Sequence, residues 1–221
     1  MSSDDPAAAD AREDPPGVDR LLALSDGVVA IALTLLVLQL KVPAAGQVAD
    51  PASAGDLAAE LGRGADQLVS YVISYYVIAQ FWLVHHRVFR HIAGQREGLA
   101  WWNFAFLLTI TLMPFTSDLL GAFSDNPLAV DIFGLNLLLA SLATQATTVF
   151  GRRQGLLTGR TITLDTRIGA ARAWASVLVI ALSMGVAWAS PDAAKYCWLL
   201  LALAPRAGER WLARGARARV S

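Results

Sequence analysis

The chain has 221 residues, of which 55% are hydrophobic and only 16% are charged, and its formal net charge is zero. Soluble domains average about 45–50% apolar and about 25% charged residues, so this composition favours a membrane protein. A zero net charge provides no overall field that would attract nucleic acid. The single cysteine, Cys197, excludes an internal disulfide framework and a cysteine-based metal site.

The first 18 residues are acidic, rich in alanine and proline, and almost free of bulky apolar side chains. Such a segment buries too little surface to offset its ordering entropy, so residues 1–18 are expected to form a disordered tail. The segment lacks the basic region that opens a signal peptide, so the apolar block that follows it is expected to be retained.

Apolar blocks recur along the rest of the chain. Five of them approach the roughly 20 residues that a spanning helix requires; they cover 21–40, 68–84, 99–120, 128–150 and 170–189. The third is expected to be interrupted at Met113-Pro114, and a weaker sixth block covers 196–204. The polar segment 51–63 predicts a short helix or loop. The sequence thus predicts an all-α, polytopic membrane protein with six transmembrane helices over 19–214 and a basic tail at 215–221.

Basic residues concentrate in alternate links between these blocks. In the links after blocks one, three and five, Arg63 is the only basic residue apart from Lys41 and Lys195, which lie at the ends of two of these links. The other two links and the C-terminal tail hold most of the arginines: Arg87, Arg90, Arg96, Arg152, Arg153, Arg160, Arg167, Arg206, Arg210, Arg214, Arg217 and Arg219. Because Lys and Arg concentrate in cytoplasmic loops, both termini are expected in the cytoplasm, which requires an even number of spans.

The motifs of soluble enzymes are absent. The chain has no phosphate-binding glycine loop, no G-x-S-x-G elbow and no H-E-x-x-H pair. His85, His86 and His91 cluster near the end of the second block without a cysteine or carboxylate at ligand spacing. Adjacent histidines point about 100° apart on a helix, so packed or hydrogen-bonded histidines are favoured over a metal site. No catalytic residue, metal or cofactor is expected.

The first block carries a serine and a carboxylate, Ser25 and Asp26, near its start. An ionised carboxylate at membrane depth costs several kcal/mol unless it is paired, so such a residue marks a function or an internal pair. His85 on the next helix is at a compatible depth, and Arg20 could also reach Asp26. The alternative is that Ser25 and Asp26 cap a helix that starts there. The leucines before Ser25 include no helix breaker, which favours the internal polar network.

The same block has an apolar stripe. At 3.6 residues per turn, Gly27, Ile31, Thr34 or Leu35, and Leu38 lie along one side of the helix. Asp26 lies about 140° around the axis from Ile31 and therefore leaves this stripe.

These motifs resemble those of a known family, the prokaryotic transmembrane protein 175 potassium channels. Arg20 with Leu24-Ser25-Asp26-Gly27 and the run to Leu38 resembles that family's R-x-x-x-F-S-D-G first helix, with Leu24 where phenylalanine is usual. Trp82 and His85 match its W-x-x-H second helix. Asn103 and Met113-Pro114-Phe115 are similar to its third helix.

The resemblance implies a homotetramer in the plasma membrane, with four first helices around a pore for K⁺ ions. It implies a hydrophobic filter rather than a ring of carbonyls, lined by Ile31, Thr34, Leu35 and Leu38. It also implies a structural polar network, made by Arg20, Ser25, Asp26, Trp82, His85 and Asn103. The protein is therefore expected to function as a leak-like, potassium-permeable channel embedded in the lipid bilayer. The alternative is a secondary transporter or proton-coupled carrier that uses Asp26 and His85 as a relay.

Overall fold

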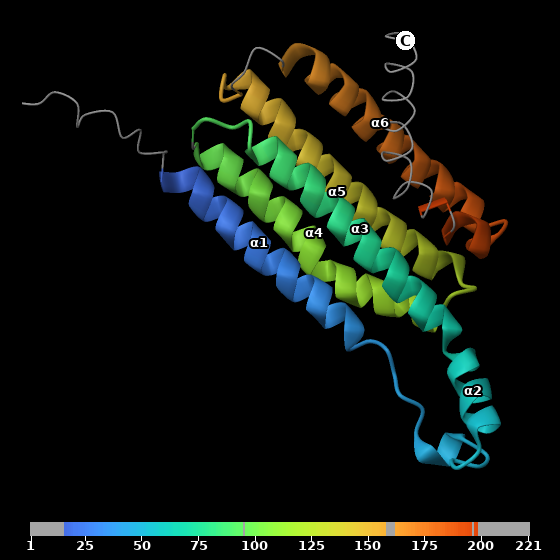
Figure 1. Cartoon of the computed structure of the whole chain (residues 1–221). Helices are drawn as coiled ribbons and strands as arrows, with labels where there is room; N and C mark the ends of the chain where they lie inside the picture. Colours follow the sequence, from blue (N-terminus) through green and yellow to red (C-terminus); the bar gives the residue numbers. More distant parts are fainter. Residues whose placement is uncertain (1–15, 95, 158–161, 196, 199–221) are drawn as a thin grey trace, which may run out of the picture.

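The chain folds into a bundle of long helices in a computed structural model that describes residues 16–94, 96–157, 162–195 and 197–198. Figure 1 shows the helices running side by side, with one short helix projecting from an end of the bundle. The α-helices of the described residues are α1 (Pro16–Val37), α2 (Ala54–Arg63), α3 (Ala65–Phe89), α4 (Glu97–Ala122), α5 (Pro127–Arg153) and α6 (Ile162–Ala187).

Four of these helices, α1, α3, α4 and α5, are long and apolar enough to cross a membrane. The apolar described part of α6, Trp174–Ala187, is shorter. The predicted all-helical, multi-pass membrane fold is therefore confirmed, and α2 confirms the short helix expected at 51–63. Most of the sixth block, 196–204, lies outside the described residues, so six spans and cytoplasmic termini remain predictions.

The first helix begins earlier than the sequence predicted. The boundary of the tail was expected after residue 18, whereas α1 starts at Pro16. A proline is well suited to the first turn of a helix, because the N–H that it lacks would have no helical partner there. Val18 is already buried, in a cluster with Phe89 and Leu99. Packing therefore extends the helix into the polar segment.

The predicted interruption at Met113-Pro114 is wrong, because α4 runs continuously from Glu97 to Ala122 with Pro114 inside it. Proline removes one hydrogen bond of the helical ladder and pushes against the preceding turn, which bends a helix. Figure 1 shows α4 changing direction in its second half. Packing against α1, α3 and α5 accompanies the continuous helix, and such neighbours let a membrane helix tolerate proline.

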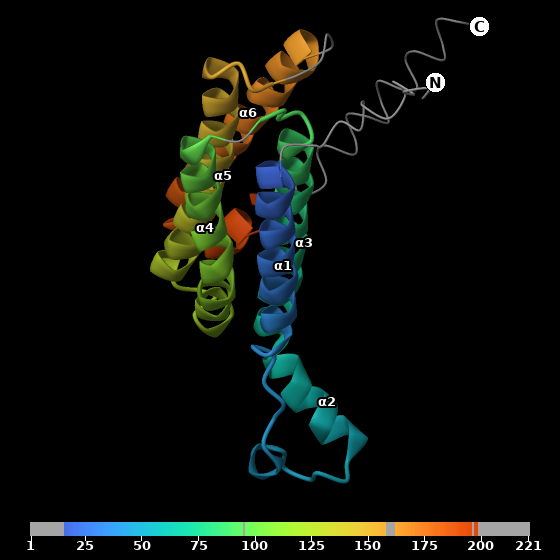
Figure 2. The same cartoon turned by 90° about the vertical axis from the view of Figure 1, so that its left-hand side faces the viewer.

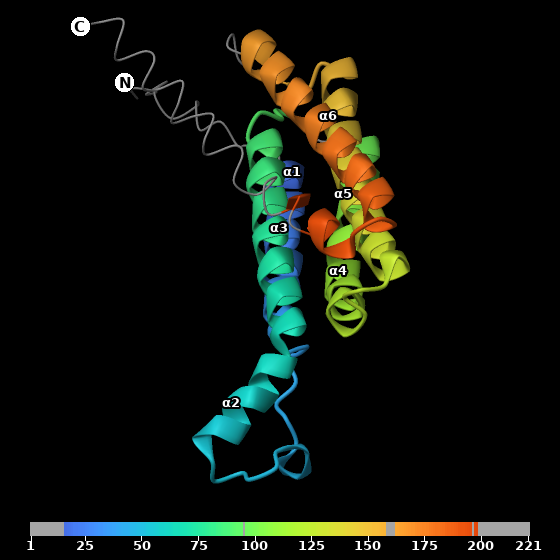
Figure 3. The same cartoon turned by 90° about the vertical axis from the view of Figure 1, so that its right-hand side faces the viewer.

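Figures 2 and 3 show the helices in layers, with α1 and α3 together, α4 and α5 beside them, and α6 against α5. The main core lies between these layers. Its largest fully buried members include Phe106, Phe133, Met113 and Trp198. The α2 helix buries none of its residues and extends away from the core.

The two described links that carry arginines meet at one end of the bundle. Ala93 N donates to the carbonyl of Leu156 at 2.8 Å, and Ile92 and Leu157 form an isolated β-bridge. The start of α1 packs into the same small cluster through Val18. We call this the basic end, after its exposed arginines Arg87, Arg90, Arg96, Arg152 and Arg153. The two described arginine-containing links, which alternate with less basic links along the sequence, therefore lie at the same end of the bundle.

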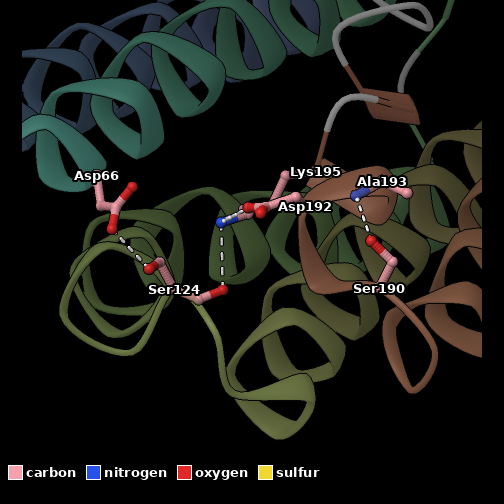
Figure 4. A network of polar contacts seen from close by, with 6 residues as sticks. All are labelled: Asp66, Ser124, Ser190, Asp192, Ala193 and Lys195. Atoms are coloured by element: carbon pink, nitrogen blue, oxygen red, sulfur yellow. Dashed lines mark hydrogen bonds and ion pairs between the residues drawn. The ribbon is translucent and has the colours of Figure 1, made fainter.

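A polar network holds the opposite end together (Figure 4). The Ser124 hydroxyl donates to the Asp66 carboxylate at 2.7 Å. The Lys195 ammonium donates to the Ser124 carbonyl at 3.2 Å and pairs with Asp192 at 2.7 Å. Lys195 is buried, so both partners compensate its lost hydration. The network connects the start of α3, the α4–α5 link and the segment after α6.

Gly121 sets the close approach of α4 to α3. A Cβ at this position would lie 2.7 Å from the Ser70 hydroxyl and 3.1 Å from the Gln67 Cα. Gly121→Ala is therefore expected to destabilise the protein by about 1–3 kcal/mol, because a backbone atom must move. The measurement is thermal unfolding of the purified protein in detergent. Gly185→Ala in α6 is the control, since nothing lies within 4 Å of its added Cβ. Equal melting temperatures for the two variants would contradict this account.

Candidate functional site

The α1 helix has one covered face and one uncovered face. Val29, Ala32 and Leu36 are 3%, 2% and 0% exposed, because they pack into the core of the bundle. On the other side, exposure is much larger; it reaches 60% for Ile31, 44% for Leu35 and 75% for Leu38. Thr34 and Gly27 are exposed on this side as well. Within the described residues, the stripe derived from helical spacing is therefore left uncovered.

Ser25 and Asp26 lie inside α1 and not at its start. The Ser25 hydroxyl is 2.7 Å from the carbonyl of Leu21, one turn earlier, and 3.1 Å from Asn103 Oδ1. Asp26 is half-buried and its Oδ1 accepts a hydrogen bond of 2.7 Å from Trp82 Nε1. The capping alternative is excluded because α1 already runs for several residues before Ser25.

Asn103 joins α1 to α3 through one carbonyl oxygen. His85 Nε2 lies 2.7 Å from Asn103 Oδ1, the same atom that faces the Ser25 hydroxyl. Because a carbonyl oxygen only accepts, His85 Nε2 carries the hydrogen in this arrangement. The imidazole ring is stacked between Phe89 and Phe106, with centroid distances of 4.4 and 4.6 Å. His85, Ser25 and Asn103 are all buried.

The structure thus brings together five of the six polar residues singled out in the sequence. They form two adjacent sets: Ser25 and His85 around Asn103, and Asp26 with Trp82. Arg20 is the exception; it is exposed, and its side chain makes no hydrogen bond or ion pair with the described residues. Asp26 and His85 have different partners, so their expected pairing is replaced by bonds to Trp82 and Asn103.

The adjacent histidines have separate surroundings. His85 faces Asn103, whereas the ring of His86 packs on Trp82 with a centroid distance of 5.4 Å. This separation follows from the roughly 100° between successive helical side chains. Among the described residues, no three His, Cys, Asp or Glu side chains are placed to hold one metal ion.

Sequence reasoning missed one polar contact of this region. Gln39, just past the end of α1, donates through Nε2 to the main-chain carbonyl of Pro114 in α4. The sequence did offer a signal: in the apolar run 27–40, the only polar side chains are Thr34 and the amide of Gln39 near its end. The aromatic neighbours of His85 were also missed, because contacts between helices leave no local pattern.

Residues 20–114 match the family model described as endosomal/lysosomal potassium channel TMEM175. A potassium channel of Streptomyces collinus is 33% identical over 131 residues, which cover 58% of this chain and 61% of that protein. A potassium channel of Chryseobacterium sp. is 31% identical over 126 residues, 56% of this chain and 59% of its own. Over this segment the chain is similar to the TMEM175 family.

The match reaches only part of these relatives, because the chain spans about three fifths of the length of the bacterial channels. A longer relative is the endosomal/lysosomal proton channel TMEM175 of Bos taurus, 31% identical over 117 residues and 24% of that protein. A crystal structure of a lysosomal potassium-selective channel TMEM175 homolog from Chamaesiphon minutus aligns with a TM-score of 0.74 and 22% identity. The alignment covers 84% of this chain and 94% of the Chamaesiphon minutus chain. This likeness shows a shared fold.

The bond between Trp82 and Asp26 is testable by a double-mutant cycle. Trp82→Phe and Asp26→Asn are each expected to lower stability, and the two changes together are expected to show a coupling of about 1–2 kcal/mol. The reason is that Trp82→Phe removes the donor whereas Asp26→Asn keeps a neutral acceptor, so the coupling is the part of the 2.7 Å bond that depends on the carboxylate charge. Thermal or denaturant unfolding in detergent provides the measurement. Trp101→Phe is the control, since Trp101 is 74% exposed and should show no coupling with Asp26→Asn.

Proposed function

We propose that the protein is a potassium-permeable channel. Four copies of the chain would form a homotetramer, and the uncovered face of α1 from each copy would line the pore. The observation that carries the proposal is this face, where Ile31, Leu35 and Leu38 are exposed although they belong to a helix otherwise packed in the core. Similarity to the family supports it, since bacterial relatives are named potassium channels.

Four copies of α1 around one axis would place equivalent residues in rings. With a rise of about 1.5 Å per residue, rings at Ile31 and Leu38 would be about 10 Å apart, with Thr34 and Leu35 between them. Symmetric assembly is the simplest way for one such stripe to enclose a path, because closed rings use the same surface in every subunit.

An apolar constriction would select ions through the cost of removing their water. Such constrictions also gate by dewetting. The hydration shell of K⁺ is held less tightly than that of Na⁺, so a modest preference for K⁺ follows. The described exposed positions from 27 to 38 on this face carry no charged side chain, and Asp26, just before them, is turned toward Trp82. A strong attraction for divalent ions is therefore not expected.

Thr34 would provide the polar group of the filter. Its hydroxyl donates to the carbonyl of Ile31 at 2.8 Å, so its hydrogen is already used within α1. The lone pairs of the hydroxyl oxygen then remain available to a partly dehydrated cation. This would lower the barrier at one level of an otherwise apolar pore.

The multi-pass chain would lie in the plasma membrane with its basic end toward the cytoplasm. The exposed arginines of that end support this orientation, since basic residues favour the cytoplasmic side. Six spans, with both termini inside, complete the proposed topology. No cofactor or catalytic residue is needed for passive ion flow.

The first experiment is cation flux from liposomes that contain the purified full-length protein, with K⁺ and Na⁺ gradients compared. The wild type is expected to favour K⁺, and Ile31→Asn is expected to change the K⁺ over Na⁺ preference about fivefold, which corresponds to about 1 kcal/mol between the two barriers. Leu178→Asn in α6 is the matched control, because Leu178 is 59% exposed but lies off α1.

The outcomes of this experiment separate three readings. Flux that Ile31→Asn leaves unchanged would retain a channel but remove the filter from α1. An absence of K⁺ and Na⁺ flux from folded protein would favour the carrier alternative, with Asp26 as the next residue to change. Proton flux without K⁺ flux would likewise contradict the proposed selectivity.

The tetramer has its own measurement. Native mass spectrometry of the detergent-solubilised protein is expected to give a mass of four chains, because a ring of α1 helices requires the copies to remain together. Chemical cross-linking in liposomes gives an independent count. A dominant monomer or dimer in both measurements would contradict the proposed pore.

A further inference from the structure

The end of α1 that lies away from Ser25 is tied to α4 by one side chain. The helix ends at Val37, and the chain continues as a tight turn in which Leu38 N and Gln39 N bond three residues back, each at 3.2 Å. From this turn, Gln39 Nε2 donates to the carbonyl oxygen of Pro114. Gln39 is half-buried, whereas Leu38 beside it is 75% exposed.

The acceptor lies where α4 is bent. A carbonyl oxygen has two lone pairs, so that of Pro114 can accept from Gln39 in addition to any bond within its own helix. The carbonyl that loses its helical partner to a proline is the one four residues earlier, here that of Ile110, so Gln39 uses the second lone pair of the Pro114 oxygen. Gln39 reaches this oxygen because it follows directly after α1, which packs along α4.

Two ties therefore hold α1 to the same helix. One joins Ser25 to Asn103 and the other joins Gln39 to Pro114. They are separated by about 21 Å along α1 and about 16 Å along α4. The exposed filter candidates Ile31, Thr34 and Leu35 lie between them, and Leu38 lies immediately beside the second tie.

We propose that Gln39 is a positioning residue for the far part of the filter. Its bond to Pro114 holds the turn that carries Leu38 and thereby keeps the Leu38 ring at the width that contributes to K⁺ preference. Leu38 needs such a tie because it lies past the last helical residue and its own side chain is barely covered. The inference rests on the proposed function, since it assigns Gln39 a role in that same pore.

Two substitutions remove the donor in different ways. Gln39→Met keeps a similar length without polarity, and Gln39→Glu keeps the shape but presents an acceptor to a carbonyl. Both are expected to lower the K⁺ over Na⁺ flux ratio, by about fivefold for a lost bond of typical strength. The control is Gln47→Glu, in the same connection. Gln47 uses Oε1 to accept from Ala44 N at 2.9 Å, so glutamate adds the same charge and retains that contact.

A second readout does not depend on flux. Leu38→Cys in a Cys197→Ala background is reacted with a membrane-impermeant thiol reagent, with and without Gln39→Met. Freeing the turn is expected to change the reaction rate by about fivefold. Ala30→Cys, on the exposed side of α1 between the two ties, is the control whose rate should remain constant.

The two readouts distinguish the failures. If the wild type conducts K⁺ and both Gln39 variants keep its ion preference and Leu38 reactivity, the role of Gln39 is refuted while the channel stands. If Gln39→Met leaves the flux ratio unchanged while Gln39→Glu and Gln47→Glu change it equally, the added charge is responsible and the inference is wrong. If the wild type conducts nothing, the proposed function fails and the pore role of Gln39 fails with it; a changed Leu38 reactivity would then support only the tie to Pro114.

Discussion

The arrangement of α1 depends on one constraint, which is that polar groups buried in a membrane helix bundle must find partners within the protein. Water is absent there, and an unpaired amide or hydroxyl costs free energy comparable to several good packing contacts. The Asn103 oxygen meets this demand for Ser25 and His85 together. Because this one atom faces side chains from two helices, it links α1 and α3 to α4.

This constraint also separates the two sides of α1. The carboxylate of Asp26 faces Trp82, and the serine faces Asn103, so both polar side chains are used inside the subunit. From 27 to 38 the opposite face carries Ile31, Leu35 and other uncharged residues. A charge at these positions would attract or repel ions over several ångströms, and its absence there leaves dehydration as the main determinant of passage through this part of the proposed pore.

The remainder of the bundle supports α1 from both ends. At the basic end, the Ala93–Leu156 bond joins two links that are far apart in the sequence. At the opposite end, Ser124 accepts from Lys195 and donates to Asp66, which connects three segments. Close packing at Gly121 lets α3 and α4 approach there. These contacts therefore hold the helices that carry the polar groups in register. The α2 helix buries no residue and is not needed for this.

Periodicity and composition by themselves determined the helical membrane fold, the alternation of basic links and the stripe through Ile31 and Leu38. These features are local or cumulative: an apolar run long enough to span and a repeat of 3.6 residues can be recognised without knowing any neighbour. Family motifs added Asn103 and Trp82 to the candidate site, since nothing in their immediate surroundings distinguishes them from packing residues.

Only the tertiary structure decided which partners these residues have. Asp26 binds Trp82 rather than His85, Arg20 remains exposed, α4 stays helical through Pro114, and Gln39 reaches the Pro114 carbonyl. Each outcome depends on the distance and angle between helices far apart in the chain. A helical stripe tells which residues share a side, but the competition among neighbouring donors and acceptors is settled by how the helices pack.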